Sequence, residues 1–125
     1  MIKEHELDAA LVAKFEELAR EYMKTFGVTD WDIGFTTTKD DSGDMACVAY
    51  MYSARAASLS IDVGFDADEE DVRVSALHEV LHLLFADMRE AVAPYLPKDD
   101  EALSLRLKSL EHSVINRIIR AWNER

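Results

Sequence analysis

The sequence predicts a single α+β domain in which three helices accompany a small, mostly antiparallel sheet of three strands. Its length is one reason, because 125 residues, of which 49% are hydrophobic, suffice for one core but not for two. Periodicity is the other reason. Apolar residues recur at helical spacing in three long segments, and three short segments between the first two are rich in β-branched and aromatic residues. We therefore treat residues 1–125 as one domain.

The first helix is expected from Glu6 to Phe26, because its apolar residues keep helical spacing and Gly27 follows where a C-terminal glycine belongs. The strands are expected at 31–38, 46–52 and 57–63, with the sequences WDIGFTTT, ACVAYMY and ASLSIDV. Polar segments separate them, and we expect the three to form an antiparallel sheet.

A second helix is expected over about residues 68–87, where apolar residues lie on most sides and indicate a central, buried helix. Either Asp66 or Asp68 can cap its N-terminus, and Glu69, three residues after Asp66, resembles the second half of a capping box. The segment AVAPYLPKDD, with its two prolines, then interrupts the pattern. A last helix is expected over about residues 99–123.

Charge and composition exclude several classes of function. The formal charge of −11 comes from 25 acidic and 14 basic residues, and no dense Lys/Arg block offers a site for a phosphate backbone, so we expect no direct nucleic-acid ligand. Cys47 is the sole cysteine, and the N-terminus MIKEHELDAA lacks the apolar core of a signal peptide. No apolar run reaches the roughly 18 residues of a membrane span. These features predict a cytoplasmic protein without membrane contact.

Residues 78–82 read HEVLH and predict a metal site. Residues four apart stack on one helix face, so His78 and His82 can both direct a nitrogen at one point about 2 Å from each. Glu79 is rotated by about 100° from His78, which places it to act as a general base on a water bound to the metal. We predict one zinc ion per chain. The alternative is that these polar residues coincide on a buried helix, but two unliganded histidines are costly among apolar neighbours.

A catalytic zinc needs a third protein ligand and an open position. Asp87 lies nine residues after His78, which turns it about 180° away from the histidine face. Glu111 is the favoured ligand, because it projects from the middle of an apolar stripe and a lone buried carboxylate needs a partner. The apolar residues that project within about 40° of Glu111 on a helix are Leu107, Ile115, Ile118 and Trp122.

Two alternatives to Glu111 stay open. Glu111 could form a salt bridge with a buried basic residue such as Arg55 or Arg73 instead of binding metal. His112, about 100° round from Glu111, could be the ligand in its place. His112 could also hydrogen-bond a ligand or stabilise an oxyanion, and we include it with Glu79 as a catalytic candidate.

The motif HEVLH together with Glu111 resembles the gluzincin metallopeptidases, in which HExxH on one helix is completed by a glutamate on a later helix. The short form is similar to minimal zincins and to ImmA/IrrE-like and phage-associated peptidases. The resemblance covers about residues 30–122 in element order, although its specific part is the motif plus Glu111. It implies a zincin-like fold in which His78, His82 and Glu111 bind zinc and Glu79 activates the water.

The resemblance also raises two points about substrate binding. Larger gluzincins stabilise the oxyanion with a Tyr or His that has no certain equivalent here, and the candidates are His112 and three tyrosines that could equally be packing residues: Tyr50, Tyr52 and Tyr95. In zincins a strand before the motif helix pairs with an extended substrate, which suggests residues 57–63. The alternative is an ordinary strand.

The expected function is a zinc-dependent peptidase that acts on a peptide or protein, with a partner protein conferring specificity on so small a domain. One alternative is a non-catalytic zinc-binding module in which the metal staples a small core. A second is an interaction protein of phage or mobile-element origin whose acidic surface binds a partner.

Overall fold

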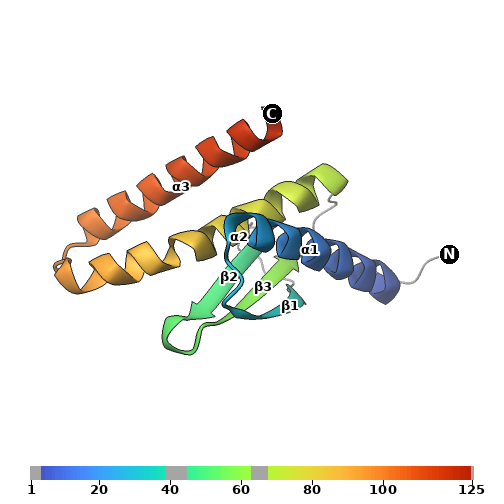
Figure 1. The fold of residues 1–125 in the computed structure, drawn as a ribbon, viewed down its shortest axis with the longest axis horizontal. Helices are drawn as coiled ribbons and strands as arrows, with labels where there is room; N and C mark the ends of the chain where they lie inside the picture. The colour runs from blue at the N-terminus through green and yellow to red at the C-terminus, as the bar shows by residue number, and fades with distance from the viewer. Residues whose placement is uncertain (1–3, 39–44, 63–67, 125) are drawn as a thin grey trace.

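The computed structural model describes residues 4–38, 45–62 and 68–124, and Figure 1 shows their arrangement. The described residues form three helices and a three-stranded sheet, so the α+β class is confirmed. In chain order the elements are α1 (Glu4–Phe26), β1 (Asp32–Thr38), β2 (Ala46–Met51), the 3-10 turn η1 (Tyr52–Ala54), β3 (Ala56–Asp62), α2 (Glu69–Val92), the 3-10 turn η2 (Ala93–Tyr95) and α3 (Glu101–Glu124).

The sheet has the order β1-β3-β2, which differs in part from the prediction. β2 and β3 form the expected antiparallel pair, with Val48 opposite Leu59. β1, however, runs parallel to β3, with Phe35 opposite Leu59, so the expectation of an antiparallel sheet is wrong for this pair. β3 lies between β1 and β2, so the two strands that are adjacent along the chain do not pair with each other.

A capping box begins α2. The Asp68 side chain accepts a hydrogen bond from the Asp71 backbone N–H at 2.8 Å, and Asp71 Oδ2 accepts one from the Asp68 backbone N–H at 3.2 Å. Asp68 is therefore the cap, while the other candidate, Asp66, lies outside the described residues. α2 continues to Val92, five residues beyond the predicted end, and η2 with its proline follows directly.

The hydrophobic core lies between the sheet and the helices, with α2 at its centre. α2 contacts α1, α3 and β2, which confirms the prediction of a central, buried helix. By contrast, α3 buries fewer residues than α2, namely Ile115 and Ile119. The largest fully buried side chains are Phe15, Leu59, Ile61, Leu77, Val80, Leu81, Leu83 and Ile115. None of the described helices is long and apolar enough to cross a membrane.

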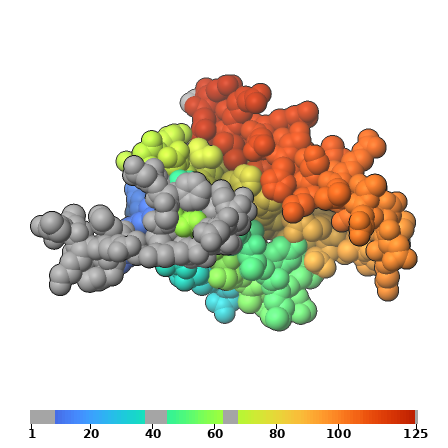
Figure 2. Space-filling view, turned by 180° about the vertical axis from the view of Figure 1, so that it is seen from behind, coloured from blue at the N-terminus to red at the C-terminus, as the bar shows by residue number. Residues whose placement is uncertain are grey.

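Seen from behind, α2 (yellow) shows between α3 (red to orange) and the green segment that contains β2 (Figure 2). The face of α2 that is not in the core therefore looks toward both α3 and β2. This face carries the histidine motif.

Candidate metal centre

One face of α2 supplies most of the polar groups of the site. His78, His82, Phe85 and Arg89 are spaced by four, seven and eleven residues from the first, which places them along one row of the helix. All four are half-buried and line one pocket. Leu81, one residue before His82, is instead fully buried in the core. The local helix thus separates core residues from site residues.

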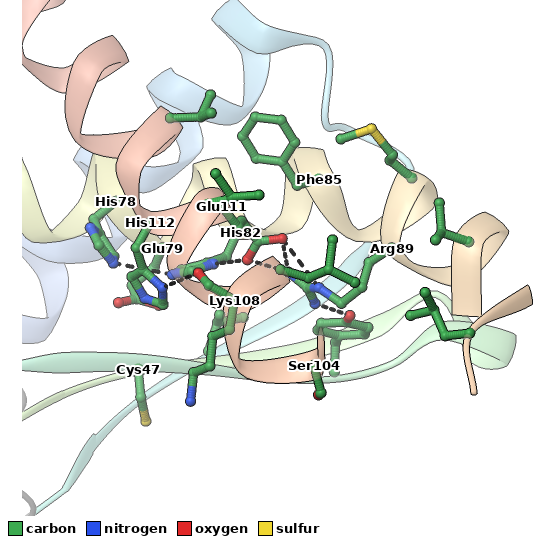
Figure 3. A pocket seen from close by; sticks show the side chains of 18 of the residues that line it. Cys47, His78, Glu79, His82, Phe85, Arg89, Ser104, Lys108, Glu111 and His112 are labelled. Carbon is green, nitrogen blue, oxygen red and sulfur yellow. Dashed lines mark hydrogen bonds and ion pairs between the residues drawn. The ribbon is translucent and has the colours of Figure 1, made fainter. Parts of the chain in front are cut away.

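The pocket has a volume of about 710 Å³ and lies between β2, α2 and α3 (Figure 3). His78, Glu79 and His82 line it from α2, and Glu111 and His112 line it from α3. Beyond these polar groups the wall is largely apolar, formed by Phe85, Met88, Val92, Leu96, Leu107, Leu110 and Val114. A polar cluster therefore lies beside an apolar wall, in a pocket whose volume is within the range typical of ligand-binding pockets.

Three imidazoles converge at this cluster. His78 Nε2 lies 3.1 Å from His82 Nε2, and the ring centroid of His112 lies 5.5 Å from that of His78 and 4.8 Å from that of His82. Each ring offers one nitrogen to the group, and these three nitrogens all lie within 4.8 Å of one another. Two of the histidines come from one turn of α2 and the third from α3, so the two helices together assemble the group.

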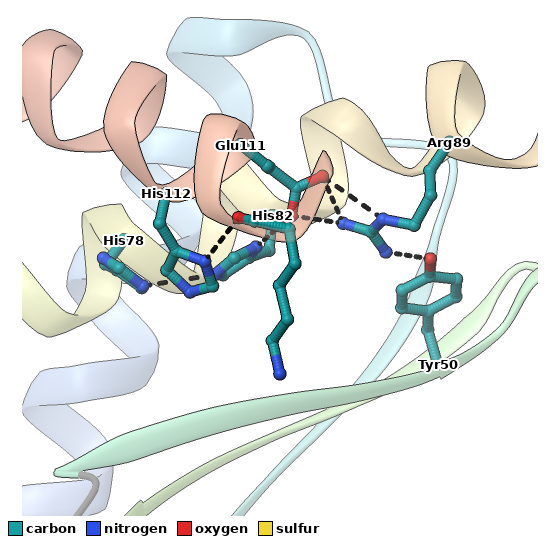
Figure 4. A network of polar contacts seen from close by, with 7 residues as sticks. Tyr50, His78, His82, Arg89, Glu111 and His112 are labelled. Carbon is teal, nitrogen blue, oxygen red and sulfur yellow. Dashed lines mark hydrogen bonds and ion pairs between the residues drawn. The ribbon is translucent and has the colours of Figure 1, made fainter. Parts of the chain in front are cut away.

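The other nitrogen of two rings is already engaged (Figure 4). His112 Nδ1 lies 2.9 Å from the carbonyl oxygen of Lys108, and since a carbonyl only accepts, this Nδ1 carries the proton. His82 Nδ1 lies 2.7 Å from Glu111 Oε2, so it donates to the carboxylate. A neutral imidazole with its proton on Nδ1 has its lone pair on Nε2, as a metal requires, and a hydrogen-bonded Nδ1 is usual for metal-binding histidines.

Electrostatics favour the neutral form of His82 and the ionised form of Glu111. Burial lowers the pKa of His82 below its ordinary 6.5 and outweighs the opposing effect of Glu111. Burial alone would raise the pKa of Glu111, but the hydrogen bonds from Arg89 and His82 outweigh it, and the pKa falls below 4.5. Burial also works against the Arg89 cation, yet the contact with Glu111 raises the pKa of Arg89 above its ordinary value.

Glu111 lies in the cluster, but its contacts are with Arg89 and His82. Arg89 Nη2 is 2.6 Å from both carboxylate oxygens and Arg89 Nε is 3.2 Å from Oε1. The salt bridge that was open as an alternative is therefore present, although with Arg89 and not with Arg55 or Arg73. Arg89 was missed in the sequence, where its place on the histidine row of α2 was the available signal.

The remaining candidates divide between the pocket and other surfaces. Glu79 lines the pocket and is 6% exposed. Tyr50 also lines it, and its hydroxyl accepts a hydrogen bond from Arg89. Tyr52 and Tyr95 do not line it: Tyr52 hydrogen-bonds Asp87, and Tyr95 is 86% exposed.

Asp87 lies on the far side of α2, as its spacing predicts. Its carboxylate accepts hydrogen bonds from Tyr52 at 2.8 Å and from Arg55 at 2.7 Å. Arg55 also pairs with Asp30 and stacks over Trp31, 4.2 Å from the ring centroid. This cluster joins α2 to the sheet and is separate from the histidines.

The strand proposed to pair with substrate is placed differently from the expectation. β3, which covers 57–62 of the predicted 57–63, is hydrogen-bonded to β1 on one side and to β2 on the other. It therefore has no free edge for an added strand, and residue 63 lies outside the described part. β2 is an edge strand among the described strands, and Ala46, Val48 and Tyr50 from it line the pocket.

No protein-family model matches this chain, and no curated protein matches it. Among solved structures, the metallopeptidase zymogen of Methanocaldococcus jannaschii jannalysin matches 78% of this chain and 94% of its own, at 16% sequence identity and a TM-score of 0.39. The gluzincin resemblance stays a prediction.

Proposed function

We propose that the chain is a zinc-dependent peptidase in which His78, His82 and His112 hold one zinc ion and Glu79 is the general base. The observation that carries the proposal is the convergence of three imidazoles from two helices, with one nitrogen of each within 4.8 Å of the others. Glu111 is assigned a different role from that expected, as the hydrogen-bond acceptor of His82.

The donor set suits zinc. Zinc prefers nitrogen and sulfur ligands, and three protein ligands leave one tetrahedral position open, as in catalytic sites. The two Nδ1 hydrogen bonds, from His82 to Glu111 and from His112 to Lys108, hold the rings with Nε2 available. A zinc ion bound there would supply Lewis acidity, which polarises a carbonyl and lowers the pKa of a water to about 7.

Glu79 is suited to move the proton. It follows His78 on α2, lines the same pocket and is nearly buried, so its carboxylate is shielded from bulk solvent. In the proposed reaction, Glu79 accepts a proton from the attacking water and returns it to the leaving amine of the cleaved peptide bond. This exchange restores the carboxylate, so Glu79 acts first as base and then as acid.

The pocket offers a surface for an extended peptide. β2 borders it and pairs with β3 on one side, which leaves its other edge without a partner among the described strands. An extended substrate can add to such an edge through backbone hydrogen bonds. The apolar wall from Phe85 to Val114 would then receive side chains of the substrate.

One observation favours a second candidate, a zinc-binding module without catalysis. α3 contributes two buried residues, Ile115 and Ile119, yet it carries His112. A metal held jointly by α2 and α3 would therefore add to a weak contact between them, and metal binding by the folded state alone stabilises that state.

The test is cleavage of an unfolded protein and of a peptide library by zinc-loaded protein, with products identified by mass spectrometry. Cleavage should disappear on chelation, return with zinc and be absent in His82→Ala. His5→Ala is the matched control, because His5 belongs to the first turns of α1, whereas the three histidines of the group belong to α2 and α3. Cleavage that survives chelation would contradict the proposal, and zinc binding without any cleavage would favour the second candidate.

A further inference from the structure

We infer that Arg89 determines which side chain completes the metal centre, because it holds Glu111 against the Nδ1 side of His82 and so leaves the third position to His112. This inference rests on the proposed function, since it concerns the ligands of the zinc ion proposed above. Arg89 is a positioning residue in this scheme, acting through Glu111.

The Glu111 carboxylate is already engaged in hydrogen bonds through both of its oxygens. An ionised carboxylate offers about four lone-pair sites. Oε1 accepts from Arg89 Nε at 3.2 Å and from Nη2 at 2.6 Å, while Oε2 accepts from Nη2 at 2.6 Å and from His82 Nδ1 at 2.7 Å. Each oxygen therefore has two contacts, with Nη2 shared between them. Glu111 could bind a metal only by giving up one of these contacts.

Arg89 is itself held in place, by Tyr50 on one side and Glu111 on the other. Its Nη1 donates to the hydroxyl of Tyr50 on β2, so the guanidinium spans the space from β2 to α3 (Figure 4). The planar fork of arginine fits a carboxylate with two parallel contacts, which a lysine cannot reproduce. The Glu111 side chain is 16% exposed, and separating a partly buried pair leaves an uncompensated charge.

His112 and Glu111 are consecutive residues of α3. Both line the same pocket, and both imidazole nitrogen and carboxylate oxygen are zinc ligands. With Arg89 present, the negative charge of Glu111 is paired and its lone pairs are used. Without Arg89 the free carboxylate would be attracted to a divalent cation, and Glu111 would compete with His112 for it.

The experiment counts imidazole ligands by X-ray absorption spectroscopy of the zinc-loaded protein and measures the zinc dissociation constant by competition with a chelator. The parent protein should show three imidazoles. Glu111→Gln should keep all three and weaken binding about tenfold, the low end for loss of a partner that orients a ligand. His112→Ala should remove one imidazole and weaken binding by more than about a hundredfold, beyond the range for such partners.

Replacing Arg89 should reverse this order. Arg89→Met should show two imidazoles and a carboxylate, and in that background Glu111→Gln should become more damaging than His112→Ala. Arg55→Met is the matched control, because Arg55 also bridges carboxylates, Asp30 and Asp87, but away from the histidines. It should keep three imidazoles. Circular dichroism would check folding. If Arg89→Met does not fold, Arg89→Lys takes its place, because a lysine keeps the positive charge but cannot make the two parallel contacts with Glu111.

Two results would overturn the inference while leaving a zinc centre in place. One is a carboxylate and two imidazoles in the parent protein, which would make Glu111 a ligand despite Arg89. The other is three imidazoles in folded Arg89→Met, which would make Arg89 irrelevant to the choice. A parent protein that takes up no zinc would instead overturn the proposed function itself.

Discussion

His82 Nε2 lies 3.1 Å from His78 Nε2, while the opposite edge of the His82 ring donates from Nδ1 to Glu111. The two nitrogens of His82 therefore have different roles: Nδ1 is a hydrogen-bond donor to Glu111, and Nε2 faces His78. Because Glu111 is ionised and acts as acceptor, the proton of neutral His82 is on Nδ1 and the lone pair on Nε2 points toward His78. The HExxH spacing brings the rings together, but a residue from another helix fixes the tautomer.

Zinc should raise the melting temperature. A ligand bound only by the folded state stabilises it by RT ln(1 + [L]/Kd), which is about 4 kcal/mol at a thousandfold excess over Kd. For a domain of this size we expect an increase on the order of 10 °C over chelated protein. Calorimetry combined with metal analysis would measure the shift and the expected single zinc per chain. His82→Ala should lose the response and His5→Ala should keep it; identical curves with and without zinc would exclude a folding-linked site.

Asp68→Ala should destabilise the protein by about 1 kcal/mol, because it removes the side-chain acceptor that caps α2. The free energy of unfolding in urea would measure this change. Asp99→Ala is the control, since Asp99 is exposed and precedes α3, and it should stay within about 0.5 kcal/mol of the parent. Zinc affinity should be unchanged, as Asp68 lies ten residues before His78; equal stability of the two variants would argue against the capping box.

Asp87→Asn should make the stability of the protein less sensitive to acid and should leave zinc binding unchanged. Hydrogen bonds from Tyr52 and then Arg55 lower the pKa of Asp87 below its ordinary 3.8. A lowered pKa in the folded state gives stability that is present above 3.8 and is lost as pH falls through the folded value. The parent should therefore be the more stable protein near neutral pH, and the difference should shrink below pH 3.8.

Denaturation midpoints of parent and variant over this pH range would test the effect. A difference independent of pH would mean that the Asp87 charge does not contribute. Loss of zinc in Asp87→Asn would place the third ligand on α2 and contradict the assignment to α3.

Local features of the chain were predictable from the sequence, and the pairing of distant segments was not. The three strands could be located because polar segments separate runs of β-branched and aromatic residues. That β1 would pair with β3 depends on contacts between segments far apart in sequence. The turn before β3 also contains Arg55 in a left-handed conformation, with φ of 50°, which the residue type does not suggest.

In the site, too, local features were predictable from the sequence and contacts between distant segments were not. The HEVLH face and the inward position of Glu111 follow from helical periodicity, which is a local property. The partner of Glu111 does not, because it depends on how α3 lies against α2 and on the reach of a long arginine side chain. Periodicity could have placed Arg89 on the histidine face, but only the packing of the helices shows that its guanidinium meets Glu111.

Glu79→Gln should separate chemistry from metal binding. Glu79 is rotated off the row formed by His78 and His82, and it does not belong to the group of converging imidazoles. Glutamine keeps the size of the side chain and removes its basicity, so the variant should bind zinc and melt like the parent. Its cleavage of a susceptible peptide should fall by at least about a hundredfold, the low end of what a positioned acid–base group contributes.

The measurement is the initial rate of peptide cleavage at equal zinc loading, with kcat and KM determined separately. A base that acts only on the reacting water should lower kcat and leave KM nearly unchanged, because Glu79 takes no part in holding the substrate in the ground state. Glu90→Gln, on the same helix and outside the pocket, is the matched control and should keep the parent rate. Full activity in Glu79→Gln would exclude it as the base, whereas loss of zinc would show that Glu79 is itself a ligand and that the three-histidine assignment is incomplete.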